Sequence, residues 1–588
     1  MERKNYNPNN TNYFQELSKF LEDDSNDPAD HEDLGEESEV EEVDQHEDDQ
    51  SSEQDGESQS SDEDALPLTE IGFYMGRDNE TKWNKKPPSE KRHTPSQNKM
   101  VPGTKGNARN AKTVLDCWKN LFTDEIIDII VKYTNQYIDT IQHEFSRGSD
   151  VRHTDVVEIH AFIGLLYLAG VYKSSRQCLE ELWGQEGDGI EKFSLVMSMK
   201  RFKFLIRSLR FDDRTTRDQR KTLDRLAPIR EIFDKFIMNC QNSYVPTENV
   251  TIGEMLLGFS GRCPFRQCIP SKPNKYGIKI FALVDVKMLY TFNMEIYAGT
   301  QPEGPFHVSN KHVDVVKRIA APLFGSGRNI TADNWFTDFN LIHELKTRKL
   351  SYVGAVSKNM RQIPNSFVNL KERTQNSSLF GFNNGTTLVS YVQRKGENTI
   401  LASSLHFDDA IDLSSGDKKK PEIFTFYNST KNCVNTLDQM CANYSVHRNI
   451  NQWPMVIFFA MLNVGGINSQ VIHLCNQSEP LRRKRLLKQL SHELAIPHMK
   501  RRSQMSGLHS SLQVRLKRFF PRDDRENSQT PPNKRRKCST CSSEEGRRTL
   551  TNYACRKCNN GVCLTHANMF CNACFSECHI LSSNEDSD

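Results

Sequence analysis

Apolar residues recur at helical spacing in the stretch that follows residue 113. After Thr123, a residue type that caps helices, they stand at Ile126, Ile127, Ile130, Val131 and Tyr137. The same spacing over residues 155–169 and 202–209 predicts two further helices, the last one flanked by lysines and arginines. Residues 114–248 are therefore expected to form a helical domain with basic edges.

The pattern changes near residue 249. Runs rich in β-branched and aromatic residues, over 278–284, 289–296, 330–333 and 352–356, predict strands, and residues 336–349 predict a helix between the last two. Strands interleaved with helices indicate an α/β layer. Residues 359–421 are polar and strand-rich, which suits an inserted β unit. Helical spacing returns over 436–441 and 454–474 and in a basic run at 481–488.

Charge is distributed unevenly along the 588 residues, a length that indicates two to four domains. Residues 22–64 hold 22 acidic residues and no lysine or arginine, and they carry too few apolar side chains to fold. We expect residues 1–113 to be a disordered tail, acidic and then basic. Since the whole chain carries +1, the remainder is strongly basic, which favours a polyanionic partner such as nucleic acid. An acidic tail that only balances a basic body is the alternative.

The chain contains no run of eighteen apolar residues, so no membrane span is expected. The first twelve residues are polar and lack the apolar core of a signal peptide. A reducing compartment is therefore expected, in which clustered cysteines bind metal more often than they form disulfides.

The C-terminal region, residues 538–579, carries four closely spaced ligand pairs. They are Cys538 and Cys541, Cys555 and Cys558, Cys563 and His566, and Cys571 and Cys574. Two thiolates at this spacing reach one Zn²⁺ at roughly 2.3 Å, and eight ligands suffice for two tetrahedral ions. Interleaved pairing in a cross-brace places Cys538, Cys541, Cys563 and His566 on one ion and Cys555, Cys558, Cys571 and Cys574 on the other. Four protein ligands on each ion leave no position open for water, so the two zinc ions are expected to be structural. A disulfide knot is the alternative.

A basic cluster lies just before this region. Lys534, Arg535, Arg536 and Lys537 end the basic linker 526–537, and such a cluster is typical of a nuclear import signal. Solvated surface charge is the alternative reading. We expect nuclear localisation.

Several strings in the chain resemble the piggyBac family of cut-and-paste transposases. They occupy residues 121–126, 261–266, 275–279, 329–337 and 436–440, in family order, and the terminal Cys/His spacing is also similar. The resemblance implies a helical dimerisation and DNA-binding domain (114–248) and a ribonuclease-H-like core (249–358 and 422–444) interrupted by a β insertion (359–421). A second helical DNA-binding domain (445–525) and the zinc region complete it. Family members bind the inverted repeats at transposon ends as dimers.

The family's chemistry uses three aspartates that hold two divalent ions, usually Mg²⁺, roughly 4 Å apart. The positions that match them here are Gly253, Asp333 and Asn435, so only Asp333 is retained. Glu254 is a poor substitute, since neighbours on a strand point to opposite faces. Asp438 matches another acid of the family motif. We expect Mg²⁺ to bind weakly or not at all, and Asp333 and Asp438 to be remnants.

The family resemblance also places DNA contacts around the entrance to the core. The basic residues Arg262, Arg266, Lys272, Lys275 and Lys279 would position phosphates, and Trp453 matches a family aromatic near the active site. A core tryptophan is the plain alternative for Trp453. Together these features predict a transposase-derived, nuclear, zinc-containing protein that binds double-stranded DNA, as a homodimer, without cutting it. An active transposase that uses the remaining acids, and a non-catalytic subunit of an active family member, are the alternatives.

Overall fold

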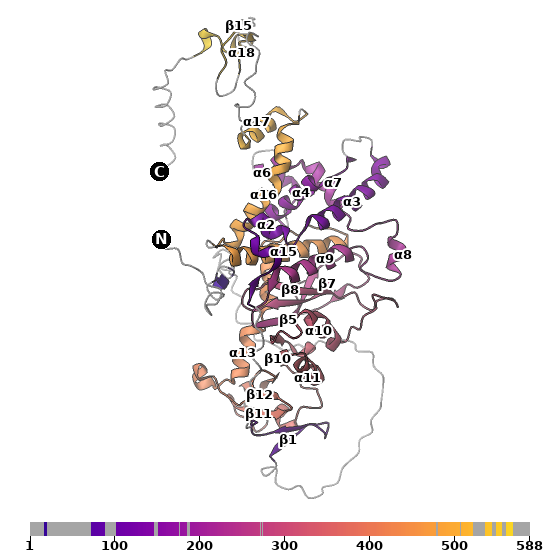
Figure 1. The fold of residues 1–588 in the computed structure, drawn as a ribbon, viewed down its shortest axis with the longest axis vertical. Helices are drawn as coiled ribbons and strands as arrows, with labels where there is room; N and C mark the ends of the chain where they lie inside the picture. The colour runs from indigo at the N-terminus through magenta and orange to yellow at the C-terminus, as the bar shows by residue number, and fades with distance from the viewer. Residues whose placement is uncertain are drawn as a thin grey trace. The chain divides into compact units, whose positions relative to one another are not determined.

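The computed structural model describes Leu17–Lys19, Leu21 and residues 72–88, 101–145, 151–175, 177–184, 189–270, 272, 274–477, 480–505, 507–520, 535–543, 549–555 and 560–567. The chain divides into two compact units, Met1–Leu516 and Lys517–Asp588. Figure 1 shows the helices and strands of each unit. The acidic segment 22–64 lies outside the described residues.

Helices from both ends of the first unit form one layer. They are α2 (Val114–Lys119), α3 (Asp124–Ile141), α4 (Val156–Val171), α7 (Met199–Ser208), α9 (Arg230–Ser243), α15 (Trp453–Asn476) and α16 (Arg483–Ser503). Thr123 directly precedes α3 as predicted, but its side chain makes no capping hydrogen bond. The α4 and α16 helices pack closely, since a Cβ on Gly164 would meet the Ser491 carbonyl oxygen at 2.9 Å. Only glycine allows this approach.

Hydrogen bonds between buried side chains join the two ends of this layer. Trp118 Nε1 on α2 donates to the Tyr167 hydroxyl on α4 at 3.0 Å, and that hydroxyl donates to the Leu462 carbonyl on α15 at 2.8 Å. Helices α2 and α4 from the expected domain 114–248 therefore pack together with α15 from the expected domain 445–525, inside the first unit. Spacing along the chain predicts the helices but not which of them meet.

Helix α15 is long and apolar enough to cross a membrane by length and composition. Its most apolar window is, however, 89% buried inside the first unit, which is the position of a core helix.

A mixed sheet carries the predicted strands. They are β5 (Asn249–Gly258), β7 (Tyr276–Asp285), β8 (Thr291–Ile296), β9 (Asn329–Ala332) and β10 (Ser351–Ala355). The strand order here is β8-β7-β5-β9-β10; β7 runs antiparallel to β8 and β5, whereas β5, β9 and β10 are parallel. Helix α11 (Phe339–Thr347) connects β9 to β10, and α14 (Cys433–Asn443) packs against β5.

The polar stretch 359–421 forms β strands as expected, but they extend the same sheet. β11 (Ser378–Asn383), β12 (Thr386–Arg394) and β13 (Glu397–Ser403) are antiparallel, and β13 pairs with β10. Helix α13 (Glu422–Thr430) then packs on β10 and β13, where Ile423 and Phe424 join a core with Val353 and Val389. Figure 1 shows β11 and β12 beside β1 at the end of the unit away from the helical layer.

Part of the N-terminal tail is ordered, contrary to the expectation for residues 1–113. β1 (Phe73–Met75) and β2 (Lys82–Asn84) form a hairpin, and β2 pairs with β11. Trp83 is only 2% exposed, and its Nε1 donates to the Gln362 carbonyl at 2.8 Å. Further along, β3 (Gly103–Thr104) pairs with β4 (Tyr244–Val245). Composition suggested disorder because this stretch is polar, and it is ordered because single apolar side chains find buried places in the first unit.

The second unit contains short elements around a cysteine cluster. β14 (Arg536–Lys537) pairs with β15 (Leu550–Thr551), and α18 (Ser539–Ser543) and η7 (Leu564–His566) complete the described part. Arg535, Arg536 and Lys537 are exposed. Because β14 comprises Arg536 and Lys537, the end of the predicted basic linker is partly a strand. Lys534 lies outside the described residues.

Candidate functional site

The sheet register sets two positions of the predicted acid set side by side. β5 and β9 are parallel with Ile252 opposite Ala332, so Gly253 and Asp333 come next on adjacent strands. Asp333 caps the short helix η5 (Asn334–Phe336) by accepting a hydrogen bond from the Trp335 N–H at 3.2 Å. Asp333 retains solvent-exposed surface at the end of β9. Many protein atoms nevertheless lie around its carboxylate and displace water from it. Desolvation and then the charge of Glu254 raise the pKa of Asp333 to about 6.

Gly253 leaves no room for a larger side chain without adjustment. A Cβ built there would lie 3.0 Å from the Cβ and Cγ2 atoms of Val434 on α14. Val434 is 3% exposed and β-branched, so it has little freedom to move away. The position that matches the first aspartate therefore supplies no ligand and packs tightly against the helix that carries Asn435.

Glu254 points to the other face of β5, as the alternation of strand residues predicts. Its carboxylate forms an ion pair with the Lys279 ammonium at 2.6 Å. Lys279 is 5% exposed and also lies over the Trp335 ring, 4.9 Å from its centroid. The charge of Glu254 is therefore already compensated, and the buried Lys279 is poorly placed for the DNA contact that the sequence suggested.

On α14, the two remaining positions of the set differ in environment. Asn435 is exposed, and Asp438 is half-buried. Desolvation raises the pKa of Asp438, and the nearby charge of Lys272 opposes this rise. Lys272 Nζ also donates to the Glu254 carbonyl oxygen at 3.5 Å. Among the described residues, neither Asp333 nor Asp438 belongs to a group of three ligands close enough to share one ion.

The predicted basic run is only partly available at the surface. Arg262, Arg266 and Lys275 are exposed, whereas Lys272 is half-buried. Arg266 donates to the carbonyl oxygens of Ser260 and Gly261, at 2.7 and 3.2 Å, which holds the loop before β7 in shape.

Trp453 lies beside this loop, although the two are far apart in sequence. Its ring meets the buried Phe265 edge to face, with centroids 5.0 Å apart. The indole is half-buried, so it is neither fully enclosed in a core nor free on the surface.

In the second unit, four predicted zinc ligands converge. Cys538, Cys541, Cys563 and His566 have ligand atoms within 4.8 Å of one another. Cys541 Sγ lies 3.7 Å from Cys563 Sγ, and His566 Nδ1 lies 3.3 Å from each of them. Zinc–sulfur bonds of roughly 2.3 Å in a tetrahedron place two thiolates about 3.8 Å apart, so this Cys3His set fits Zn²⁺.

Backbone N–H groups of Cys541 and Cys563 lower the pKa of the Cys538 thiol, which favours the thiolate that binds metal. This set is the first of the two that the spacing predicts. Of the second set, Cys555 is half-buried, and Cys558, Cys571 and Cys574 lie outside the described residues.

Comparisons with known proteins agree with this architecture. The family described as "Transposase IS4" matches residues 113–470, well over half the chain. A cryo-EM structure of a piggyBac transposase synaptic complex with hairpin DNA is 36% identical, with a TM-score of 0.70, and the match covers 81% of this chain and all of that one. The chain therefore belongs to the piggyBac-type transposases of this family.

Two curated human relatives are more distant. PiggyBac transposable element-derived protein 3 is 22% identical over 357 residues, which is 58% of each chain. The chimeric ERCC6-PGBD3 protein is 22% identical over 357 residues, or 58% of this chain and 32% of that protein. This chain thus spans somewhat over half the length of the first relative and about a third of the second.

Proposed function

We propose that this chain is a transposase-derived protein that binds double-stranded DNA, in the nucleus and as a homodimer, without cutting it. Family membership supports DNA binding, because the related piggyBac transposase forms a complex with hairpin DNA. Arg262, Arg266 and Lys275 offer exposed positive charge that can contact phosphates. Inverted repeats of related elements are the DNA that this family resemblance suggests.

We further propose that β8-β7-β5-β9-β10 form a ribonuclease-H-like core. Three antiparallel strands followed by two parallel ones support this assignment, together with an acid at the end of the fourth strand, Asp333. In such a core, two divalent ions need several anionic ligands, because the ions repel one another.

The observation that carries the loss of cleavage is the packing of Gly253 against Val434. A carboxylate is absent at the position beside Asp333, and the neighbouring Glu254 is bound to Lys279. Asn435 adds no charge. The residues present therefore do not fit a pair of Mg²⁺ ions.

DNA binding and cleavage are measured on the same duplex, which carries a piggyBac-type inverted repeat, with a scrambled duplex as control. At about 150 mM salt we expect tighter binding to the repeat and no strand cleavage in Mg²⁺. Mg²⁺-dependent cleavage that disappears in Asp333→Asn would establish the active transposase instead. Binding that appears only when an active family member is added would favour the subunit alternative.

A second pair of variants tests the reason for inactivity. The double variant Gly253→Asp with Asn435→Asp restores the acid set. A triple variant that also carries Val434→Ala relieves the contact at Gly253. We expect calorimetric Mg²⁺ binding in the presence of DNA only for the restored variants. Mg²⁺ binding of equal strength by the unaltered chain would contradict the proposal.

The Cys3His set would hold one structural Zn²⁺, which would tie the short elements of the second unit together. We propose that Cys555, Cys558, Cys571 and Cys574 hold a second ion. Exposed charge at Arg535, Arg536 and Lys537 supports nuclear import through this cluster. Replacing Lys534 and these three residues by glutamine should shift a tagged chain to the cytoplasm, whereas an unchanged nuclear signal would sink the assignment.

A further inference from the structure

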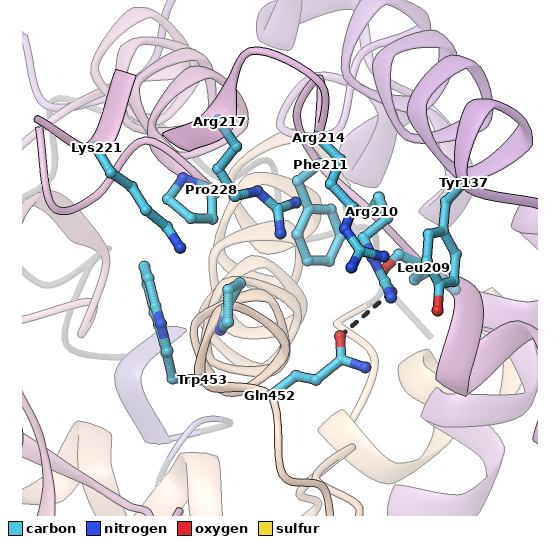
Figure 2. Close-up of a pocket in the computed structure, with 11 residues that line it drawn as sticks. Tyr137, Leu209, Arg210, Phe211, Arg214, Arg217, Lys221, Pro228, Gln452 and Trp453 are labelled. Atoms are coloured by element: carbon cyan, nitrogen blue, oxygen red, sulfur yellow. Dashed lines mark hydrogen bonds between the residues drawn. The ribbon is translucent and has the colours of Figure 1, made fainter. Parts of the chain in front are cut away.

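A pocket of about 290 Å³ lies within the helical layer at the start of α15, and none of its lining residues is acidic. Arg210, Arg214, Arg217 and Lys221 line it together with Tyr137 and Trp453, and we call it the arginine pocket. Figure 2 shows these side chains around the first turn of α15, with the Trp453 ring near the Lys221 ammonium. These four cations repel one another, and of the four only Arg217 is paired with a carboxylate among the described ion pairs, that of Asp212.

Arg210 is the most deeply buried of the four cations. It is 9% exposed, and its guanidinium donates only to neutral oxygens: the carbonyls of Arg207 and Leu209, at 2.9 and 2.7 Å, and Gln452 Oε1 at 3.3 Å. Among the residues that the structure describes, Arg210 forms no ion pair with a carboxylate. A buried guanidinium without a counter-ion is costly, which favours an anion from outside.

The nearby acid is already occupied. Asp212 is 3% exposed and accepts hydrogen bonds from Arg217 and Arg220, the latter at 2.6 Å. Desolvation is the main reason that the pKa of Arg210 is lowered to about 10; Tyr137 and Asp212 oppose this fall, and the charges of Arg217 and Arg214 add to it. The positive charge of the pocket therefore exceeds the negative charge available to it.

The pocket is preformed and adjoins the basic loop. The guanidiniums of Arg210 and Arg214 lie 3.6 and 5.1 Å from the centroid of the Tyr137 ring, which orients both. The N-terminus of α15 adds partial positive charge, and Gln452, the residue before this 24-residue helix, caps it without a side-chain hydrogen bond. Trp453 joins the pocket to the loop of Arg262 and Arg266 through Phe265.

We propose that the arginine pocket binds a phosphate-bearing anion through Arg210, Arg214, Arg217 and Lys221. Guanidiniums in this arrangement match phosphate oxygens in charge and geometry. Under the proposed DNA-binding function, on which this choice of source rests, the phosphate belongs to the DNA backbone. A free polyphosphate is the other source of the same chemistry.

The test uses the full chain and inorganic pyrophosphate, measured by calorimetry in zinc-replete buffer. Arg214→Gln with Lys221→Gln removes two exposed pocket charges, and Arg394→Gln with Lys395→Gln removes two exposed charges at the β12–β13 turn as the matched control. We expect pyrophosphate to bind about tenfold more weakly to the pocket variant, and no change in the control. Equal affinity in all three proteins, or no binding to any, would overturn the proposal.

A parallel titration of duplex DNA at several salt concentrations identifies the source. If the pocket holds backbone phosphates, the slope of log affinity against log salt falls by about 2 in the pocket variant only. If pyrophosphate binding weakens but this slope is unchanged, the pocket stands and its ligand is a free polyphosphate. If the unaltered chain binds no DNA, the proposed function fails, and the calorimetry alone decides the pocket.

Discussion

The carboxylate of Glu254 lies 2.6 Å from the ammonium of Lys279, in an ion pair that joins β5 to β7. Glu254→Gln removes the counter-charge of a buried ammonium and should lower the free energy of unfolding by about 2 kcal/mol. Urea denaturation at neutral pH measures this loss. Adding Lys279→Met should recover part of it, and an equal or larger loss in the double variant would show that the pair is not coupled.

We predict that the packing against Val434 requires glycine at position 253. Gly253→Ala places a methyl group 3.0 Å from Val434 and should cost about 1 to 2 kcal/mol of stability. The same substitution in a Val434→Ala background should cost less, because the contact is gone. Chemical denaturation of the four proteins gives the coupling, and costs that simply add would contradict the assigned contact.

Asp333 should make the stability of the first unit depend on pH. Its folded pKa of about 6 lies above the ordinary value of 3.8, so the folded chain binds the proton more tightly. Stability should therefore fall as pH rises from about 4 to about 6 and stay lower above that. Asp333→Asn keeps an oxygen for the Trp335 N–H, and it should raise the melting midpoint at about pH 7 but not at about pH 4. A difference independent of pH would contradict this assignment.

Metal removal should act on the second unit alone. A chelator, or Cys538→Ser with Cys563→Ser, removes ligands that tie together β14, α18 and η7, so hydrogen exchange there should become fast. The melting midpoint of the first unit should change little. Metal analysis of the untreated chain should give two zinc ions if the second set binds, and one if only the described set does.

Trp83 should contribute to stability far more than its place in a polar tail suggests. Trp83→Ala removes a nearly fully buried ring and its hydrogen bond to Gln362, at a cost of about 3 to 5 kcal/mol. Lys86→Ala, three residues on and exposed, is the control and should be neutral. Similar denaturation midpoints for the two variants would show that β2 is not held in place in solution.

The sequence predicted features that depend on neighbours along the chain. Helix spacing located α3, α4 and α15, and apolar runs located β7 through β10 close to their observed bounds. The Cys-x-x-Cys and Cys-x-x-His spacings gave the ligands around Cys538, because metal geometry restricts such pairs to short separations.

Features that depend on distant contacts were missed. A hairpin of three-residue strands, such as the one around Trp83, has too few apolar positions to show a period. The arginine pocket was missed because its cations come from a loop and a short helix, while Trp453 approaches from the start of a helix over two hundred residues later. A signal was available in Arg210, Arg214, Arg217 and Lys221, whose spacing resembles one face of a helix, but their convergence on Trp453 depends on the fold.

The pairing of β2 with β11 has a consequence for how the chain is made. Asn383 donates to the carbonyl oxygen of Lys82 across a separation of 301 residues. At a synthesis rate of 5 to 20 residues per second, roughly 15 to 60 s pass between the synthesis of β2 and that of β11. During that interval β2 lacks its place in the sheet, and when β11 has been made, β2 is already available to pair with its edge.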